Sequence, residues 1–469
     1  MSTAISREVH AGRLRRIAQK LYTTNFDDPP ERIVRRNLYP ILARYFPQAV
    51  ISHRSALEGG LSQDGSIFLT YKHTRRMTLP GVTIRLLQGE GPVEGDTPFM
   101  GGLFLASRTR ALLENLQPAR ARSGLAKSWS KAEVEELLDK VARVHGEREL
   151  NQLRDHARRI APTLGLEREF QVLNELVGAL LGTRVAPLGS AAARARAAGT
   201  PYDPACLERC LALFAALKRA VLPARLTPPS HIGGAANLAF FEAYFSNFIE
   251  GTEFEVEEAA DIVFHGRIVE RRPADSHDIL GTFRIVSDTT ELRRILGIGA
   301  DLVELLKARH LVLLSGRPEQ NPGRFKETAN RVGQTVFVAP ELVEGTLLKA
   351  FESYQALDHP LARAMYLKFL VAEVHPFNDG NGRIARVMMN AELVRAGQVR
   401  IIIPTVYRDD YLLALRALTR QGNTDPYLHM LDRAQAFTAQ IDFSDYDGAL
   451  AQLRAANAFL EPDEGQLLD

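Results

Sequence analysis

The chain has 469 residues, of which 45% are hydrophobic and 24% are charged, and its formal net charge is only +2. This length predicts two to four domains, and the apolar content is sufficient for buried cores. The N-terminus carries charges without an apolar leader, and no apolar run of about 18 residues follows, so the sequence predicts neither secretion nor membrane insertion.

The N-terminal end concentrates the positive charge. The first 54 residues hold ten Lys and Arg side chains but only four Asp and Glu. Periodicity and turn residues predict three helices followed by two strands, at Glu8–Lys20, Glu31–Tyr45, Ser52–Leu57, Ser66–Tyr71 and Gly81–Gln88. This order predicts an α+β, winged-helix-like region at residues 1–90, and its charge indicates nucleic-acid binding.

Three short strings in this region, Gly12–Tyr22, Phe46–His53 and Ser55–Leu57, are similar to the N-terminal winged helix of AbiEi-type antitoxin regulators. The resemblance implies that the N-terminal region binds DNA. A solvated basic face on a helical bundle explains the same charge pattern without nucleic acid, and both interpretations stay open.

The composition changes near the middle of the chain. Glu149–Leu181 has a helical pattern, whereas Gly182–Pro204 is rich in Ala, Gly, Arg and Pro, which is typical of a linker. We therefore predict an α+β or helical extension at 91–185, a linker at 186–205, a mainly helical domain at 206–440 and a C-terminal tail at 441–469.

The two cysteines, Cys206 and Cys210, lie four residues apart on one predicted helix. Because no further metal ligand is near them in the sequence, this spacing favours buried apolar side chains over a metal site. So few cysteines fit a reducing cytoplasm, where we expect the protein to be located.

Two further segments have clear patterns in the second half of the chain. Phe240–Ile249 is an aromatic-rich helical stretch, and Thr252–Glu258 has the pattern of a cap followed by the first turn of another helix. Residues 323–328 and 332–340 have the pattern of two short strands around a turn.

The most informative motif is His375–Arg386, with the sequence HPFNDGNGRIAR. It lies between helical patterns at 365–374 and 384–393, so its glycines are expected to form a tight turn before the second helix. Backbone N–H groups at such a turn attract anions, and glycines let a phosphate approach the backbone closely. The motif therefore predicts a phosphate-binding loop.

Four side chains of this motif supply matching chemistry. Arg383 and Arg386 share a helix face and are suited to binding phosphate oxygens. Asp379 is a hard oxygen ligand for Mg²⁺. His375 is the group that accepts a proton near neutral pH. The combination of a proton acceptor, a carboxylate and two guanidiniums indicates chemistry at a phosphate group.

The motif resembles the signature of the Fic family, His-Pro-Phe-x-(Asp/Glu)-Gly-Asn-Gly-Arg-x-x-Arg, and matches every specified position. The resemblance covers about half of the chain and implies a helical core with a β-hairpin flap. It implies transfer of AMP from ATP, with Mg²⁺, to a Ser, Thr or Tyr hydroxyl of a target protein, with His375 deprotonating the hydroxyl and Asp379 binding the metal. The residues that it implies at the nucleotide are Glu250, Val332, Gly333, Gln334, Thr335, Asp379, Gly380, Asn381, Gly382, Arg383, Ile384, Ala385, Arg386, Tyr411 and Leu412.

The segment Ser246–Gly251 is similar to the inhibitory motif of the family, (Ser/Thr)-x-x-x-Glu-(Gly/Asn). This similarity implies an ion pair between Glu250 and Arg386 that withholds the arginine from the γ-phosphate. An ordinary helix end at Gly251 is the alternative. In some relatives the same glutamate supports removal of AMP, so a de-AMPylase also stays open.

The strands predicted at 323–328 and 332–340 occupy the place of the family's flap, a hairpin that captures the target backbone by strand addition. An ordinary surface hairpin is the alternative. Two positions depart from the family pattern. Leu412 replaces one of two aromatic residues near the adenine, and Lys368 stands where many members have a histidine.

The sequence as a whole thus predicts a mainly α-helical, autoinhibited AMP transferase preceded by the winged-helix-like region. The alternative from another class is a DNA-binding, antitoxin-like regulator in which the helical half senses a ligand. The intact His375 favours an enzyme, because a binding module needs no base. The identity of the target, and whether the chain acts as a homodimer, are left open.

Overall fold

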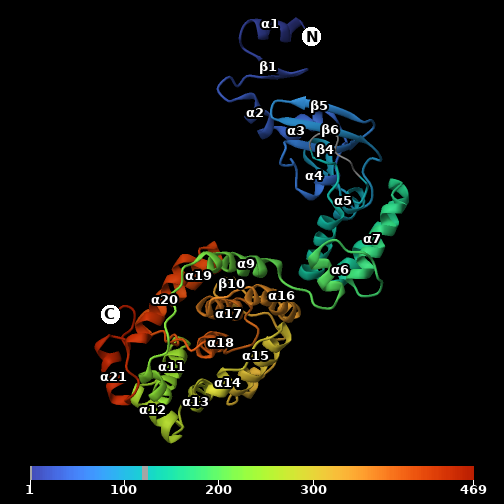
Figure 1. The fold of residues 1–469 in the computed structure, drawn as a ribbon. Coiled ribbons are helices and arrows are strands. Elements are labelled where there is room, and N and C mark those ends of the chain that lie inside the picture. The colour runs from blue at the N-terminus through green and yellow to red at the C-terminus, as the bar shows by residue number, and fades with distance from the viewer. Residues whose placement is uncertain (1–2, 119–124, 469) are drawn as a thin grey trace. The chain divides into compact units, whose positions relative to one another are not determined.

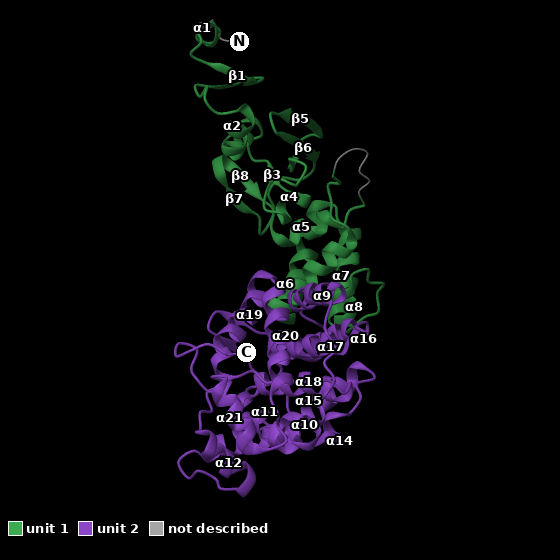
Figure 2. Cartoon of the chain, turned by 60° about the vertical axis from the view of Figure 1, so that its left-hand side comes forward, with its two compact units in different colours: residues 1–199 green, residues 200–469 purple. Residues whose placement is uncertain are grey.

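The computed structural model describes residues 3–118 and 125–468 of the chain. The chain divides into two compact units, a first unit at Met1–Gly199 and a second unit at Thr200–Asp469. Figure 2 shows the first unit in green and the second in purple. This division lies within the range 186–205 that we expected to be a linker. That range also contains helix α8 (Ala191–Ala197), which packs on helices of the first unit.

A mixed sheet of six strands forms the centre of the first unit, in the order β5-β6-β4-β3-β8-β7. Figure 1 labels β4, β5 and β6 of this sheet. The pairs β4–β6 and β3–β8 are parallel, and the other pairs are antiparallel. The strand bounds are β3 Val50–Ile51, β4 Ser66–Tyr71, β5 Arg75–Leu79, β6 Val82–Gln88, β7 Thr97–Phe99 and β8 Leu103–Leu105. Helices α2 (Pro30–Arg36) and α3 (Leu38–Tyr45) pack on this sheet, and their apolar side chains share one core with it.

Most predicted elements of this region are confirmed. Strands β4 and β6 agree with the predicted strands, and α4 (His53–Leu57) agrees with the short helix. The helix predicted at Glu31–Tyr45 is divided into α2 and α3 at Asn37. Pro40 explains the break, because proline has no N–H to donate to the carbonyl of Arg36 and its ring collides with that carbonyl in a continuous helix.

The helix predicted at Glu8–Lys20 is wrong. Helix α1 (Thr3–His10) ends just before Gly12, which adopts a left-handed backbone with a φ of 68°. Strand β1 (Arg15–Ala18) then pairs with β2 (Leu21–Thr23) in an antiparallel hairpin. The region thus holds more strands than the two predicted, and its winged-helix and DNA-binding interpretations stay predictions.

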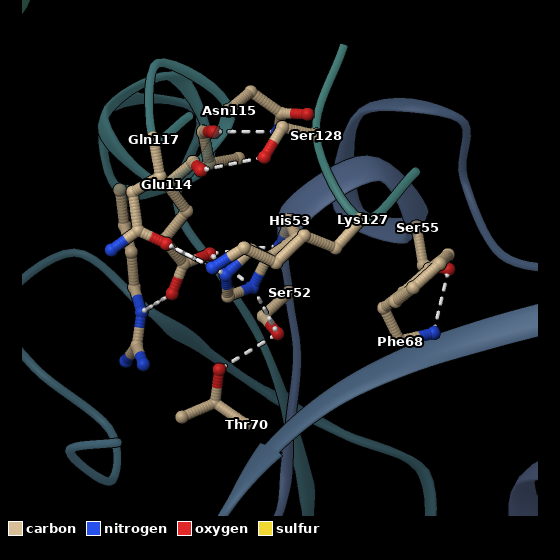
Figure 3. A network of polar contacts seen from close by, with 12 residues as sticks. Ser52, His53, Ser55, Phe68, Thr70, Glu114, Asn115, Gln117, Lys127 and Ser128 are labelled. Atoms are coloured by element: carbon tan, nitrogen blue, oxygen red, sulfur yellow. Dashed lines mark hydrogen bonds and ion pairs between the residues drawn. The ribbon is translucent and has the colours of Figure 1, made fainter. Parts of the chain in front are cut away.

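A buried polar network joins α4 to helix α5 (Arg108–Asn115) in the first unit, as Figure 3 shows. The backbone N–H of His53 donates to Glu114 Oε2 at 2.8 Å, and the His53 ring lies 3.1 Å from Ser52 Oγ. Arg110 donates to Glu114 Oε1 at 2.9 Å. Burial lowers the pKa of His53, so its ring is neutral at pH 7. Because these groups satisfy one another, we assign the network a structural role.

Three helices complete the first unit around a separate hydrophobic core. These are α6 (Lys131–Leu164), α7 (Glu167–Leu180) and α8, and α6 and α7 also contact α5. The Ser130 side chain caps α6, and Glu133 returns a hydrogen bond to the backbone of Ser130.

The second unit is almost entirely helical, which confirms the predicted fold class (Figure 1). Helices α17 (Pro360–Val374) and α18 (Asn381–Arg395) pack against each other and are buried along nearly their whole length. The other helices of the unit are α9 Pro204–Arg219, α10 Pro229–Gly233, α11 Ala235–Ile249, α12 Val256–His265, α13 Pro273–Ser287, α14 Thr289–Leu292, α15 Gly299–Leu313, α16 Val343–Gln355, α19 Arg408–Gln421, α20 Asp425–Gln440 and α21 Tyr446–Ala455.

The end of the chain belongs to this helical core. Helix α21 buries Leu450 and Leu453 in the same cluster of apolar side chains that contains α17 and α18. Residues 441–468 are therefore packed on the second unit. None of the helices in the part of the chain that the structure describes has the length and apolar character needed to cross a membrane.

Candidate active site

A cavity of about 320 Å³ lies where the loop between α17 and α18 meets the end of α11, the hairpin after residue 330 and helix α19. Its lining residues come from segments that are far apart in the sequence. Among the predicted site residues, those that line it are Glu250, Val332, Gly333, Thr335, His375, Gly382, Arg386, Tyr411 and Leu412.

The remaining predicted residues lie beside the cavity rather than on its lining. They are Gln334, Asp379, Gly380, Asn381, Arg383, Ile384 and Ala385. Ile384 and Ala385 are buried in the hydrophobic core of the unit, and Gln334 is exposed at the turn of the hairpin. Direct contact with a nucleotide is therefore less favourable for these three residues than the resemblance implied.

The side chain of Asn381 fixes the loop of the signature. It accepts a hydrogen bond from Phe377 N at 2.9 Å and donates one to Phe377 O at 2.8 Å. His375 ends α17 with a φ of 52°, and Gly380 precedes α18 with a φ of 72°. The loop is thus held so that the free N–H groups of the first turn of α18 stand at its end, as anion binding requires.

His310, on α15, supports this loop from the other side. Its ring stacks on Phe377 with centroids 3.7 Å apart and planes inclined by 3°. Its Nε2–H donates to Asp379 O at 3.0 Å, and its Nδ1 accepts from Gly323 N at 2.9 Å. Burial lowers the pKa of His310 to about 4, so the ring stays neutral. Sequence reasoning missed His310, because a lone histidine in an apolar helix carries no signal.

His375 is arranged as a neutral proton acceptor. Its Nδ1 lies 3.3 Å from Ala372 O, so Nδ1–H is the donor and Nε2 keeps its lone pair. Phe337 stacks on its ring with centroids 3.7 Å apart and planes inclined by 8°. Burial lowers the pKa of His375 to about 4. The imidazole is therefore unprotonated, and able to accept a proton, at pH 7.

Arg386 forms the ion pair that the sequence predicted. Its Nη2 donates to Glu250 Oε1 at 2.7 Å and to Ser246 O at 2.8 Å, and its Nε donates to Ser246 Oγ at 2.9 Å. Burial acts to raise the pKa of Glu250, but the guanidinium of Arg386 outweighs it and the net pKa is lowered. Glu250 is thus ionised at neutral pH and forms an ion pair with the guanidinium of Arg386.

Gly382 makes room for this contact. A Cβ atom at this position would lie 2.0 Å from Glu250 Oε1, closer than any two such atoms approach. Gly382 also lies in the first turn of α18, where free backbone N–H groups favour negative charge. The carboxylate of Glu250 therefore occupies space directly beside the start of this helix.

Arg383 also pairs with a carboxylate. Its Nη1 lies 2.6 Å from Asp278 Oδ2, and its Nη2 lies 3.6 Å from Asp379 Oδ2. Asp278, on α13, receives two further hydrogen bonds from Arg317 Nε at 3.0 and 2.9 Å. Asp278 is almost fully buried, so it fixes the orientation of Arg383. No motif marks Asp278, and sequence reasoning missed it.

Lys368 lies behind the cavity and is fully buried. Its Nζ has no hydrogen-bond partner among the described residues, but it lies 4.3 Å from the ring centroid of Tyr411 and 5.0 Å from that of Tyr427. Burial lowers the pKa of Lys368. Tyr411 Oη in turn accepts from Arg386 Nη1 at 3.4 Å. Lys368, the departure from the family pattern, is thus connected to Arg386 through Tyr411.

A short hairpin borders the cavity, but it differs from the predicted strands. Strand β9 (Arg331–Val332) pairs with β10 (Thr335–Val336), and we call this the flap hairpin. The strand predicted at 323–328 is wrong. Side chains attach that segment to the signature loop instead, because Lys326 Nζ donates to Asn330 Oδ1 at 2.6 Å and Asn330 Nδ2 donates to Phe377 O at 2.9 Å.

Asp379 is the carboxylate best placed to hold a metal ion beside phosphates. Its side chain is 45% exposed, and its Oδ1 accepts from Gly380 N at 2.6 Å. In residues 3–118 and 125–468, no three His, Cys, Asp or Glu side chains cluster as a metal site would need. A single carboxylate fits Mg²⁺, which takes its remaining ligands from substrate phosphates and water.

Comparison with known proteins agrees with the motif. Residues 301–393 match the model of the Fic/DOC family. The chain is 28% identical over 230 residues to protein adenylyltransferase Fic of Drosophila willistoni, covering 48% of this chain and 45% of that protein. It is 26% identical over 208 residues to the protein of the same name of Drosophila melanogaster, covering 42% of each. The chain thus matches less than half of the length of these curated relatives.

Two solved structures of Fic proteins also align with part of this chain. Fic-1 of C. elegans aligns over 69% of this chain and 90% of its own with 19% identity and a TM-score of 0.40. A Fic domain protein of Bacteroides thetaiotaomicron aligns over 52% of this chain and 97% of its own with 18% identity and a TM-score of 0.40. The match of residues 301–393 to the family model, together with the signature inside that range, identifies these residues as a domain of the Fic/DOC family.

Proposed function

We propose that the second unit is a protein adenylyltransferase, which transfers AMP from ATP to a hydroxyl side chain of a target protein and is inhibited by Glu250. The observation that carries this proposal is that His375, a neutral base, lines the same cavity as Arg386 and Gly382. A base, a guanidinium and a helix start around one cavity are what nucleotidyl transfer needs. The names of the curated relatives support the same reaction.

In the proposed reaction, the hydroxyl oxygen of the target attacks the α-phosphorus of ATP. The new O–P bond forms as the bond between the α-phosphorus and the bridging oxygen breaks, and pyrophosphate leaves with that electron pair. His375 Nε2 accepts the hydroxyl proton. The hydrogen bond from Nδ1–H to Ala372 O fixes the tautomer and holds the lone pair on Nε2.

The start of α18 and the two arginines are proposed to bind the polyphosphate. Free N–H groups of the first turn favour negative charge, and a guanidinium neutralises the charge that develops on pyrophosphate. Arg383 is already oriented by Asp278. Asp379 would hold a Mg²⁺ ion, which supplies further charge neutralisation at the phosphates when it is bound.

Inhibition is proposed to act by competition for Arg386. While Arg386 donates to Glu250, it is withheld from the phosphate, and the Glu250 carboxylate repels the polyphosphate. The Ser246 backbone and hydroxyl hold the same guanidinium, so the arginine is fixed in this arrangement by several contacts. Removing the carboxylate should therefore free Arg386 without disturbing its position.

The first experiment uses purified wild type, Glu250→Gly and His375→Ala with Mg²⁺ and ATP labelled at the α-phosphate. Labelled protein is detected after denaturing electrophoresis, and mass spectrometry locates AMP. We expect labelled protein with Glu250→Gly, and no labelled protein with the double variant that carries both Glu250→Gly and His375→Ala. Glu253→Gly is the matched control, since Glu253 is an exposed glutamate three residues away that does not contact Arg386.

Each result has a distinct meaning. No label with folded Glu250→Gly, on the chain itself or in a lysate, would refute the proposed transfer. Equal label with Glu250→Gly and Glu253→Gly would refute the inhibitory role. A de-AMPylase would instead remove AMP from a previously modified target faster with wild type than with Glu250→Gly, and a time course separates the two activities.

A further inference from the structure

A second, larger cavity lies next to the candidate active site. This groove has a volume of about 720 Å³ and runs between α19 and α20. Arg416 and Arg420, one helical turn apart on α19, line both this groove and the cavity that contains His375. The two cavities are therefore adjacent and share these two arginines. We call this surface the α19–α20 groove.

The rim of the α19–α20 groove is positively charged. Arg416, Arg420 and Arg433 line it with His429, while Asp410 is the carboxylate in the lining. Within the described part of the chain, neither Arg416 nor Arg420 forms an ion pair with a carboxylate. An exposed guanidinium without a carboxylate partner is well suited to bidentate binding of an incoming Asp or Glu.

The floor of the groove is apolar. Ala414, Ala417 and Met430 lie in its lining, and Leu413 beside them is 57% exposed. A groove with an apolar floor and a basic rim complements a peptide in which acidic and apolar side chains alternate. Nucleic acid is a poorer match, because its phosphates leave the apolar floor without a partner and approach Asp410.

The flap hairpin connects to this groove. Arg420 Nη2 donates to Thr335 Oγ1 of strand β10 at 3.2 Å, so the end of α19 lies against the flap hairpin. A peptide added to the flap hairpin is extended, and its side chains at i and i+2 are about 6.6 Å apart on one face. Arg416 and Arg420 are about 6 Å apart along the helix axis. The spacing of the two arginines thus fits acidic residues at alternate positions.

We propose that the α19–α20 groove binds an acidic segment of the target protein, with Asp or Glu at alternate positions, next to the hydroxyl that receives AMP. This proposal rests on the proposed function, because it assumes that the bound protein is the one that receives AMP. The binding itself needs neither ATP nor transfer of AMP. It specifies the substrate as a protein with a hydroxyl residue followed or preceded by an acidic, partly apolar strand.

A binding experiment tests the groove without catalysis. The probe is a fluorescein-labelled peptide of 12 residues with one Thr and with Glu and Val alternating, and the control peptide has Gln for every Glu. Fluorescence anisotropy with the full chain measures both affinities at 50 mM and 500 mM salt. We expect the acidic peptide to bind at least tenfold more tightly at low salt, and the difference to shrink at high salt.

Charge reversal locates the binding surface. We expect Arg416→Glu to weaken the acidic peptide at least fivefold. Arg293→Glu is the matched control, because Arg293 is an exposed arginine of the same unit that is not in the groove, and it should change the affinity less than twofold. Equal affinity for the two peptides, or equal loss with Arg416→Glu and Arg293→Glu, would overturn the proposal. So would a 20-base-pair duplex that binds through Arg416 while the acidic peptide does not.

A second measurement separates this proposal from the proposed function. Glu250→Gly is incubated with labelled ATP and each peptide in turn. If the chain labels itself but labels the acidic peptide no more than the Gln-containing control peptide, the docking proposal is overturned and AMP transfer still stands. Binding of the acidic peptide through Arg416 without any label would support the docking site and refute AMP transfer.

Discussion

The ring of Phe337 covers one face of His375, and this contact gives a prediction for the pH dependence of the proposed reaction. Phe337→Ala opens that face to water. The cost of burying a charged imidazole then falls, so the pKa of His375 should rise from about 4 toward its ordinary value of 6.5. More of the histidine is then protonated in mild acid, and a protonated histidine accepts no proton.

The size of the effect follows from these two values. With a pKa of about 4, about 97% of His375 is neutral at pH 5.5, and with a pKa of 6.5 only about 9% is neutral. A complete return therefore lowers the rate at pH 5.5 about tenfold relative to pH 7.5. Because other groups also bury the ring, we expect a relative loss between about threefold and tenfold.

The assay is the rate of AMP transfer from pH 5 to pH 8 in the Glu250→Gly background, with each rate divided by that at pH 7.5. This division removes any pH-independent loss that Phe337→Ala causes at the flap hairpin. Phe337→Leu keeps an apolar cover and should keep the parent profile. NMR titration of the His375 ring measures the same pKa without catalysis. Superimposable profiles and an unchanged ring pKa in Phe337→Ala would refute this reasoning.

Three other predictions follow from the same contacts. Glu250→Gln keeps the shape of the side chain but removes its charge. Because the competing ion pair is worth about 2–3 kcal/mol, its loss should tighten ATP binding about 30- to 150-fold, which calorimetry measures. An unchanged Kd for ATP would contradict the competition. Asp278→Asn removes the buried carboxylate that lies 2.6 Å from Arg383 and leaves the longer ion pair with Asp379 in place. It should lower the free energy of unfolding in urea by about 3–5 kcal/mol, while a loss under about 1 kcal/mol would show that the pair is dispensable. His310 and His375 bind protons in the unfolded state near pH 6.5 but in the folded state only near pH 4, so the free energy of unfolding should fall as the pH is lowered through this window, by up to about 3 kcal/mol for each ring. Urea unfolding at pH 7 and pH 5 measures this fall, and His375→Gln should reduce it.

The parts of the site that the sequence could predict are those encoded locally. The run from His375 to Arg386 contains its own turn residues, its own helix start and its own charges, so its conformation depends little on distant residues. The pairing of Glu250 with Arg386 was predicted because the inhibitory motif has a recognisable pattern. In both cases the signal lies within twelve consecutive residues.

The parts that escaped prediction depend on tertiary contacts. Asp278 and His310 lie in ordinary helical patterns, and only the packing of α13 and α15 against the signature loop gives them a role. The strand predicted at 323–328 failed because Lys326 bonds to Asn330, which in turn bonds to Phe377 of the loop, and no strand in the described part of the chain pairs with this segment. The N-terminal helix failed for a local reason, since Gly12 ends it and a hairpin competes with the helical pattern.

If Glu250 inhibits the protein as proposed, its close approach to Gly382 and Arg386 sets the strength of that inhibition. The carboxylate is a ligand attached to its own receptor, held at the end of α11 within hydrogen-bond reach of Arg386. A ligand tethered in this way acts at a fixed effective concentration, which no dilution of the protein lowers. In the proposed function, ATP must exceed that effective concentration to displace it. The length and rigidity of the α11 end, rather than the abundance of any inhibitor, would then set the ATP level at which the protein becomes active.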